Sequence, residues 1–126
     1  LDTGSDADAA QAISSLAQVH LRTGEPELAA LLARHALELL GGREDFVDEI
    51  GNAQLVLGRA LLAQDRHDEA AGCFERADVS FERLDSASHR AAAWMAQGDL
   101  AAARGDSDAA VERFRAAAEA LQDFHF

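Results

Sequence analysis

The amino-acid sequence predicts an all-α fold in which a single domain is built from three antiparallel helical hairpins. Three observations predict this. The 126 residues include one proline and no tyrosine and are rich in Ala, Leu, Glu and Arg, a composition that favours helices. Apolar residues recur at helical spacing. Three segments with matching small residues follow one another at steps of 41 and 40 residues, namely 14–36, 55–77 and 95–117.

Apolar spacing and turn residues together predict six helices. Their ranges are 7–23, 26–40, 44–64, 67–84, 87–104 and 107–123, so that the three repeats span about 7–42, 43–84 and 85–124 of the one domain 1–126. The predicted apolar stripe of the second helix consists of Leu28, Leu31, Leu32 and Leu39. That of the sixth consists of Val111, Phe114, Ala118 and Leu121.

Each hairpin is predicted to turn at one residue. Gly24 in the first hairpin and Gly105 in the third suit the left-handed conformation that ends many helices. After Gly105, either Asp106 or Ser107 can cap the next helix. The second hairpin has Asp65 at this place. Because Asp adopts the left-handed region less readily than Gly, we expect that turn to be strained or differently built.

Small residues mark where the two helices of a hairpin come closest. Large side chains do not fit at the closest contact of two antiparallel helices, and glycine inside a helix needs a packing reason. We expect the contacts Ala17 with Ala29, Gly58 with Ala70, and Gly98 with Ala110. The residues beside these contacts are predicted to be Ala33, Phe74 and Phe114.

The same positions resemble the signature of the tetratricopeptide repeat (TPR) family. The third repeat carries Trp94, Gly98, Gly105, Ala110, Phe114 and Ala117, and the second carries Leu57, Gly58, Leu61, Ala70, Phe74 and Ala77. The first carries fewer, namely Leu16, Gly24, Ala29 and Ala36. The resemblance implies a right-handed array of hairpins, a TPR-like solenoid with repeats of about 40 residues where about 34 is usual. The proline that ends the family motif is missing from all three repeats.

Longer repeats of this kind are similar to the C-terminal region of actinobacterial helix-turn-helix transcriptional regulators, and stretches 44–62 and 89–106 carry that similarity. It implies a bacterial, cytoplasmic sensor or dimerisation module in a longer chain, with DNA bound by another segment. The alternative is a free-standing scaffold or adaptor that binds a peptide in its concave groove. The net charge of −12 disfavours direct binding to nucleic acid or to anionic membranes, and no apolar run is long enough to span a membrane.

Catalytic and metal chemistry are not expected. The five histidines have no metal-ligand spacing; they are His20, His35, His67, His89 and His125. Cys73 has no identifiable base and is interpreted as a small buried hydrophobe. Trp94 is interpreted as a core residue and not as a binding platform. The sequence therefore predicts no enzyme and no cofactor.

The predicted binding surface is the concave face, which the first helix of each hairpin lines in a stacked array. The candidate partner-binding residues are Gln18, Arg22, Asn52, Arg59, Met95 and Asp99. Asn52 and Arg59 lie two turns apart and are candidates to hold a carboxylate or a peptide backbone; the alternative is that they are ordinary solvated residues. The expected partner is a protein or peptide. A homodimer is a further hypothesis, with Leu121, Phe124 and Phe126 as the self-association residues.

Overall fold

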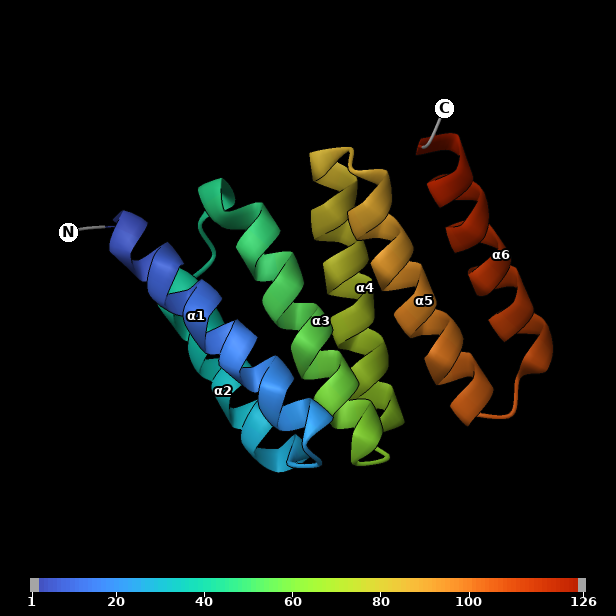
Figure 1. Ribbon diagram of the computed structural model, residues 1–126, viewed down its shortest axis with the longest axis horizontal. Helices are drawn as coiled ribbons and strands as arrows, with labels where there is room; N and C mark the ends of the chain where they lie inside the picture. The colour runs from blue at the N-terminus through green and yellow to red at the C-terminus, as the bar shows by residue number, and fades with distance from the viewer. Residues whose placement is uncertain (1–2, 125–126) are drawn as a thin grey trace.

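The computed structural model describes residues 3–124, whose regular structure is entirely helical (Figure 1). The α-helices are α1 (Thr3–Arg22), α2 (Pro26–Leu40), α3 (Val47–Ala63), α4 (His67–Leu84), α5 (Ala87–Ala103) and α6 (Ser107–Phe124). A 3-10 turn, η1 (Glu44–Phe46), precedes α3 and replaces the first turn of the helix predicted at 44–64. The all-α prediction is confirmed, and α1 begins four residues before its predicted start.

The six helices pack in adjacent pairs. Contacts are most extensive between α1 and α2, between α3 and α4, and between α5 and α6. The pairs are joined where α2 packs on α3 and α4 packs on α5, while α3 and α5 touch only sparsely. Figure 1 shows α1 and α6 at opposite ends of the row. Burial therefore occurs between neighbouring helices along the row, and α3 has neighbours on both sides.

The turns that join the helices of each pair share one hydrogen-bond pattern. The residue after the turn donates its N–H to a carbonyl five residues back, which satisfies an end group of the preceding helix. The donors are Glu25, Arg66 and Asp106, and the acceptors are the carbonyls of His20, Leu61 and Ala101 at 2.8, 2.9 and 2.9 Å. The residues before the donors have left-handed φ values, +85° at Gly24, +60° at Asp65 and +80° at Gly105. The turn at Asp65 is therefore built like the other two, and a non-glycine residue adopts its left-handed conformation.

The sequence left open which residue caps α6. Asp106 does so, because its Oδ1 accepts the N–H of Ala109 at 3.1 Å. Ser86 has the equivalent role at α5, where its Oγ accepts the N–H of His89 at 3.4 Å. Asp85, the residue directly before Ser86, adopts a left-handed conformation and ends α4.

In two of the helix pairs, a glycine of the first helix faces a phenylalanine ring of the second. A Cβ atom at Gly58 would lie 2.6 Å from Cδ1 of Phe74, and one at Gly98 would lie 2.8 Å from Cδ1 of Phe114. The atoms nearest to these two glycines are ring atoms and not atoms of Ala70 or Ala110, the predicted neighbours; both alanines are buried. The missing Cβ makes room for the ring, which lies directly against the glycine.

A third contact of this type was not predicted. A Cβ atom at Gly51 would lie 2.9 Å from Cδ1 of Phe81. Gly51 and Gly58 are two helical turns apart on α3, as Phe74 and Phe81 are on α4, so the antiparallel helices meet twice in the same register. Both phenylalanine rings are fully buried.

The predicted apolar stripes are only partly buried. In α2 the buried residues are mostly alanines, whereas Leu31 is 64% exposed and Leu28 is 39% exposed. In α6 Val111 and Phe114 are both exposed on one side. Small residues thus form most of the buried face of α2, and several large apolar side chains of α2 and α6 lie partly in solvent.

Candidate functional site

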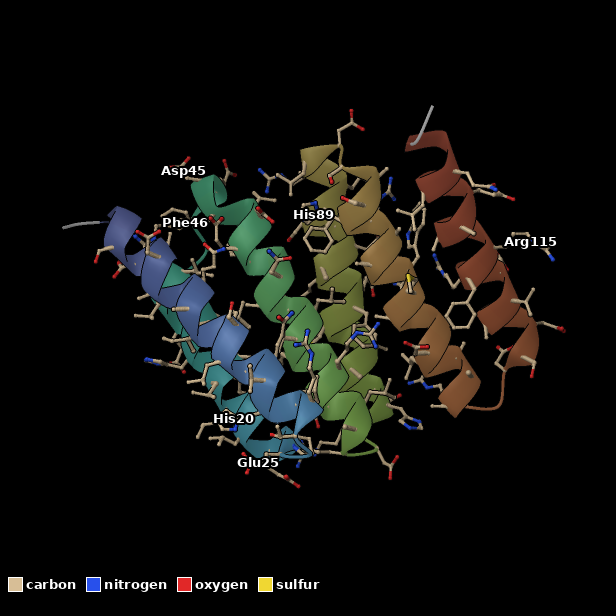
Figure 2. The ribbon with its side chains drawn as sticks, in the orientation of Figure 1. His20, Glu25, Asp45, Phe46, His89 and Arg115 are labelled. Carbon is tan, nitrogen blue, oxygen red and sulfur yellow. The ribbon has the colours of Figure 1, made fainter. Side chains whose placement is uncertain are left out.

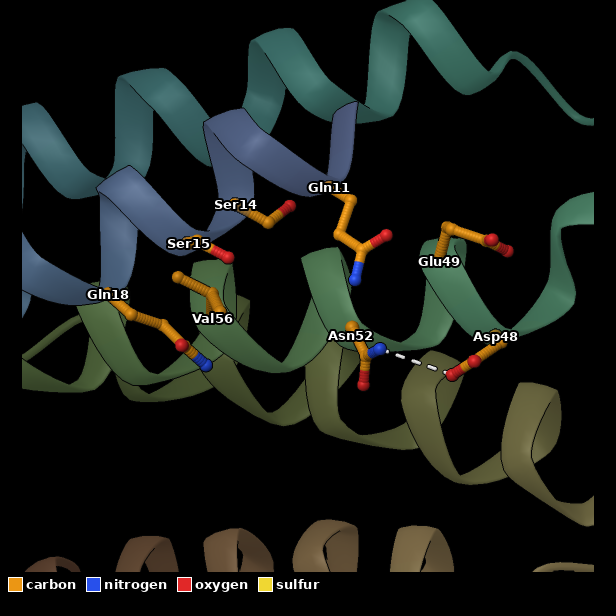
Figure 3. A pocket seen from close by; sticks show the side chains of 8 residues that line it. All are labelled: Gln11, Ser14, Ser15, Gln18, Asp48, Glu49, Asn52 and Val56. Carbon is orange, nitrogen blue, oxygen red and sulfur yellow. Dashed lines mark hydrogen bonds between the residues drawn. The ribbon is translucent and has the colours of Figure 1, made fainter. Parts of the chain in front are cut away.

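A polar groove of 220 Å³ lies between α1 and α3 (Figure 3). Its lining residues are Gln11, Ser14, Ser15 and Gln18 of α1, and Asp48, Glu49, Asn52 and Val56 of α3. Spacings of three and four residues place each set on one face of its helix. The groove is therefore formed where the polar faces of two helices meet.

Most hydrogen-bonding groups of this groove are unused. Asn52 Nδ2 donates to Asp48 Oδ1 at 3.1 Å, as the dashed line in Figure 3 marks. Within residues 3–124, the side chains of the four polar residues on α1 make no hydrogen bond, although Ser14 is buried. Amides and hydroxyls can both donate and accept hydrogen bonds. The groove thus offers free donors and acceptors to a ligand.

The charge in the groove is negative. Asp48 and Glu49 are half-buried at one end of it. In the described part of the chain, Glu49 makes no ion pair, whereas Asp48 lies 3.1 Å from His89 Nε2. A cationic group would be attracted to the free carboxylate at this end.

The structure separates the six predicted partner-binding residues. Gln18 and Asn52 both line the groove. Arg59 and Asp99 form an ion pair between α3 and α5, with Nη1 3.0 Å from Oδ2. Met95 is 44% exposed on α5, outside the groove, and Arg22 is exposed near the end of α1.

These contacts change the expected chemistry. Asn52 and Arg59, the two donors expected to hold a carboxylate, already bind the carboxylates of Asp48 and Asp99. An anionic ligand would have to displace Asp48 from Asn52 or Asp99 from Arg59. The free carboxylate of Glu49 makes a neutral or cationic ligand the better match.

Ser86, His89 and Asp48 lie in a row of polar contacts that the sequence pattern does not reveal: a hydrogen bond joins Ser86 to His89, and an ion-pair contact joins His89 to Asp48. His89 Nδ1 lies 2.6 Å from Ser86 Oγ, and its Nε2 lies 3.1 Å from Asp48 Oδ1; Figure 2 labels His89. These residue types also form hydrolytic triads. Here Ser86 is the N-cap of α5, and the His89 ring packs 4.9 Å from that of Phe81. We interpret these contacts as structural: Ser86 caps α5, and His89 links α5 to Asp48 of α3.

Cys73 is buried, as its position predicts, with 3% of its surface exposed. Burial raises the pKa of its thiol, against the smaller opposite effects of the Arg76 and Arg34 guanidinium groups. The thiol therefore stays protonated near neutral pH, and thiolate is the reactive form. Among residues 3–124, no three His, Cys, Asp or Glu side chains are grouped as metal ligands; His125 lies outside that range.

Trp94 is not the core residue that the sequence predicts. Its ring is half-buried in a shallow hollow beside Ala120, with the Arg90 guanidinium 4.7 Å from the ring centre. Of the predicted self-association residues, Leu121 is half-buried in α6. Phe124 is the last residue of α6 and its side chain is not among those described; Phe126 lies outside the described residues.

Comparison with protein-family models, with curated proteins and with solved structures finds no match to this chain. Within the described residues, none of the helices combines the length and the apolar character needed to cross a membrane.

Proposed function

We propose that this chain is a non-catalytic protein-interaction module that binds an extended peptide segment of a partner in the groove between α1 and α3. One observation carries the proposal, namely that four polar side chains with no partner in the described structure face one groove. An extended peptide has backbone N–H and C=O groups that need partners, and side-chain amides can satisfy both kinds. Gln11 and Gln18 lie two helical turns apart, a separation of about 10 Å, so they can contact peptide units about three residues apart in an extended segment.

The charge of the groove specifies the peptide further. A lysine or arginine of the peptide would lie beside Glu49, which makes no ion pair within residues 3–124. The net charge of the whole chain, −12, would repel the phosphate backbone of a nucleic acid. We therefore propose that the module does not itself bind nucleic acid.

We also propose that the chain is a TPR domain. The paired helices, the shared turn geometry and the glycine–phenylalanine contacts support a TPR-like solenoid, a right-handed array of three antiparallel hairpins. On the resemblance of the sequence, the module serves as the sensor or dimerisation part of a bacterial, cytoplasmic transcriptional regulator whose DNA-binding segment lies elsewhere.

A second hollow supports the alternative of a scaffold that holds two partners. This hollow of 530 Å³ lies among α4, α5 and α6 and includes the side chains of Glu75, Asp78, Arg104 and Arg113. The scaffold alternative predicts that two different peptides bind the chain at the same time. The single-groove module predicts that they compete.

The peptide proposal is tested with a double variant, Gln18→Ala with Glu49→Ala. A random octapeptide library containing one fixed arginine is selected on the unmodified chain, and the affinity of selected peptides is then measured by fluorescence polarisation. Losing a hydrogen bond and a charge contact is expected to weaken binding by about tenfold or more.

The matched control removes the same two group types elsewhere, with Gln122→Ala and Glu38→Ala on exposed positions of α6 and α2. This control is expected to bind like the unmodified chain. Equal affinity for the groove variant and the control would overturn the assignment of the groove.

A further inference from the structure

The first helix of the row exposes an apolar face that is buried on the helices equivalent to it. On α3, Ala53, Leu57 and Ala60 are buried with 0%, 7% and 0% of their surface exposed. The residues 41 positions earlier on α1 are all exposed; they are Ala12, Leu16 and Val19, the latter two at 47% and 50%. Within residues 3–124, no helix covers this α1 end face.

The last helix has the complementary feature. On α2, which packs on α3, Ala30 and Ala33 are buried with 2% and 0% exposed. The residues 81 positions later on α6 are Val111 and Phe114, which are 51% and 38% exposed. Together with the exposed Ala118 they form the α6 end face, which the described residues also leave uncovered.

These two end faces are the two halves of a contact that the chain already makes internally. The face that α2 and α4 turn to the next helix is the one that α6 leaves open, and the face that α3 and α5 turn to the preceding helix is the one that α1 leaves open. The ends lie at opposite sides of the row in Figure 1, so one chain cannot join its own ends. We infer that α6 of one copy docks on α1 of a second copy in the way that α2 docks on α3.

The charges near the end faces match this docking. Between α4 and α5, Arg104 Nη2 lies 2.7 Å from Asp68 Oδ1. Asp108 on α6 is the position equivalent to Asp68, and Arg22 on α1 is one residue before the position equivalent to Arg104. Both are exposed and make no ion pair within the described residues, so docking brings two opposite charges together.

The symmetry of this contact has a consequence that can be measured. Different surfaces meet, so each added copy leaves one free face at each end of the assembly. Association therefore continues past two copies, as an open chain or a closed ring. It uses residues separate from the peptide groove, so the failure of one proposal leaves the other intact.

The test is sedimentation velocity of the whole chain from about 10 µM to about 1 mM, a range that covers weak association. The variants are Val19→Asp on the α1 end face and Val111→Asp on the α6 end face. The control is Val79→Asp on α4, since Val79 is 55% exposed and lies on neither end. Circular dichroism checks that all variants stay helical.

The unmodified chain and the control are expected to form trimers and larger species as concentration rises. Each end variant alone is expected to be monomeric, because a charge is buried without a partner at every contact. An equimolar mixture of the two end variants is expected to form a heterodimer and nothing larger, because only one pair of intact faces remains.

A monomeric unmodified chain at every concentration would overturn the inference. So would a mixture that stays monomeric. A dimer that Val111→Asp abolishes and Val19→Asp leaves intact would show instead that α6 pairs with α6.

Discussion

The pair α3–α4 and the pair α5–α6 contain the same contact in different surroundings. Gly58 meets Phe74 in one and Gly98 meets Phe114 in the other. Phe74 is fully buried, whereas Phe114 is 38% exposed. The difference arises because α5 covers α4, while no described helix covers the outer side of α6. Local sequence thus determines how two helices of a pair meet. The next helix determines how far that contact is buried, and so how much it contributes to the free energy of unfolding.

The largest expected effect comes from removing the two rings. Phe74→Ala is expected to lower the free energy of unfolding by about 3–5 kcal/mol, because it leaves a cavity in the core. Phe114→Ala is expected to lower it by about half as much, because its ring is already partly in water. Urea denaturation followed by circular dichroism measures both. Equal losses would mean that the outer side of α6 is covered in solution.

A smaller effect is expected from filling the space opposite each ring. Gly58→Ala places a Cβ atom against Phe74 and is expected to cost about 1–3 kcal/mol. Gly98→Ala is expected to cost less, since the exposed Phe114 can shift toward solvent. Thermal unfolding compares the two melting temperatures.

The control for these glycines is Gly72→Ala. A Cβ atom there would meet only the flexible Arg76 side chain, at 3.5 Å. This change is expected to stabilise the helix by up to about 1 kcal/mol. A stabilising Gly58→Ala would contradict the assigned contact.

The turns of these two pairs have the same backbone conformation but a different residue in it. Asp65 adopts the left-handed conformation that Gly105 adopts in the other pair. Asp65→Gly is therefore expected to raise the free energy of unfolding by about 0.5 kcal/mol, after the greater freedom of the unfolded glycine is subtracted. Gly105→Asp is expected to lower it by a similar amount. A change of opposite sign in either variant would mean that the turns are not equivalent.

The smallest effect concerns Cys73 on α4, whose equivalent on α6 is the exposed Arg113. Burial raises the pKa of the Cys73 thiol above its ordinary 9.0, so the unfolded chain loses this proton at a lower pH than the folded chain. The thiol therefore makes its full contribution to the free energy of unfolding below pH 9.0, and this contribution is lost as the pH rises through the folded pKa. Above about pH 9, the free energy of unfolding of the Cys73→Ala variant is expected to depend less on pH than that of the unmodified chain. Denaturation series at several alkaline pH values measure the difference.

The sequence predicted the local features of the fold well. Helix spacing and turn residues identified all six helices, and the left-handed glycines lie where their turns require them. These features depend on residues a few positions apart. The burial of Cys73 followed equally from its place on the inner side of α4.

Features that depend on distant residues were not predictable in this way. The ion pair of Arg59 with Asp99 joins residues 40 positions apart, and the contact of His89 with Asp48 also joins different pairs. The sequence pairing of Gly58 with Ala70 did not anticipate the Phe74 ring against the glycine, because a missing Cβ also admits a ring from the facing helix. For the candidate site, the sequence placed Gln18 and Asn52 on one surface but could not show which donors were already occupied.

The tight turns at residues 23–25, 64–66 and 104–106 also affect how the chain folds. Each closes a helix pair through a short loop, so the contacts within a pair join residues close in sequence. Such local contacts give rapid folding, because little chain entropy is lost before they form. Amide protons of α3, which has neighbours on both sides, are expected to exchange with solvent most slowly, and those of α6 most rapidly. The row of helices would then open from its α6 end while its centre remains folded.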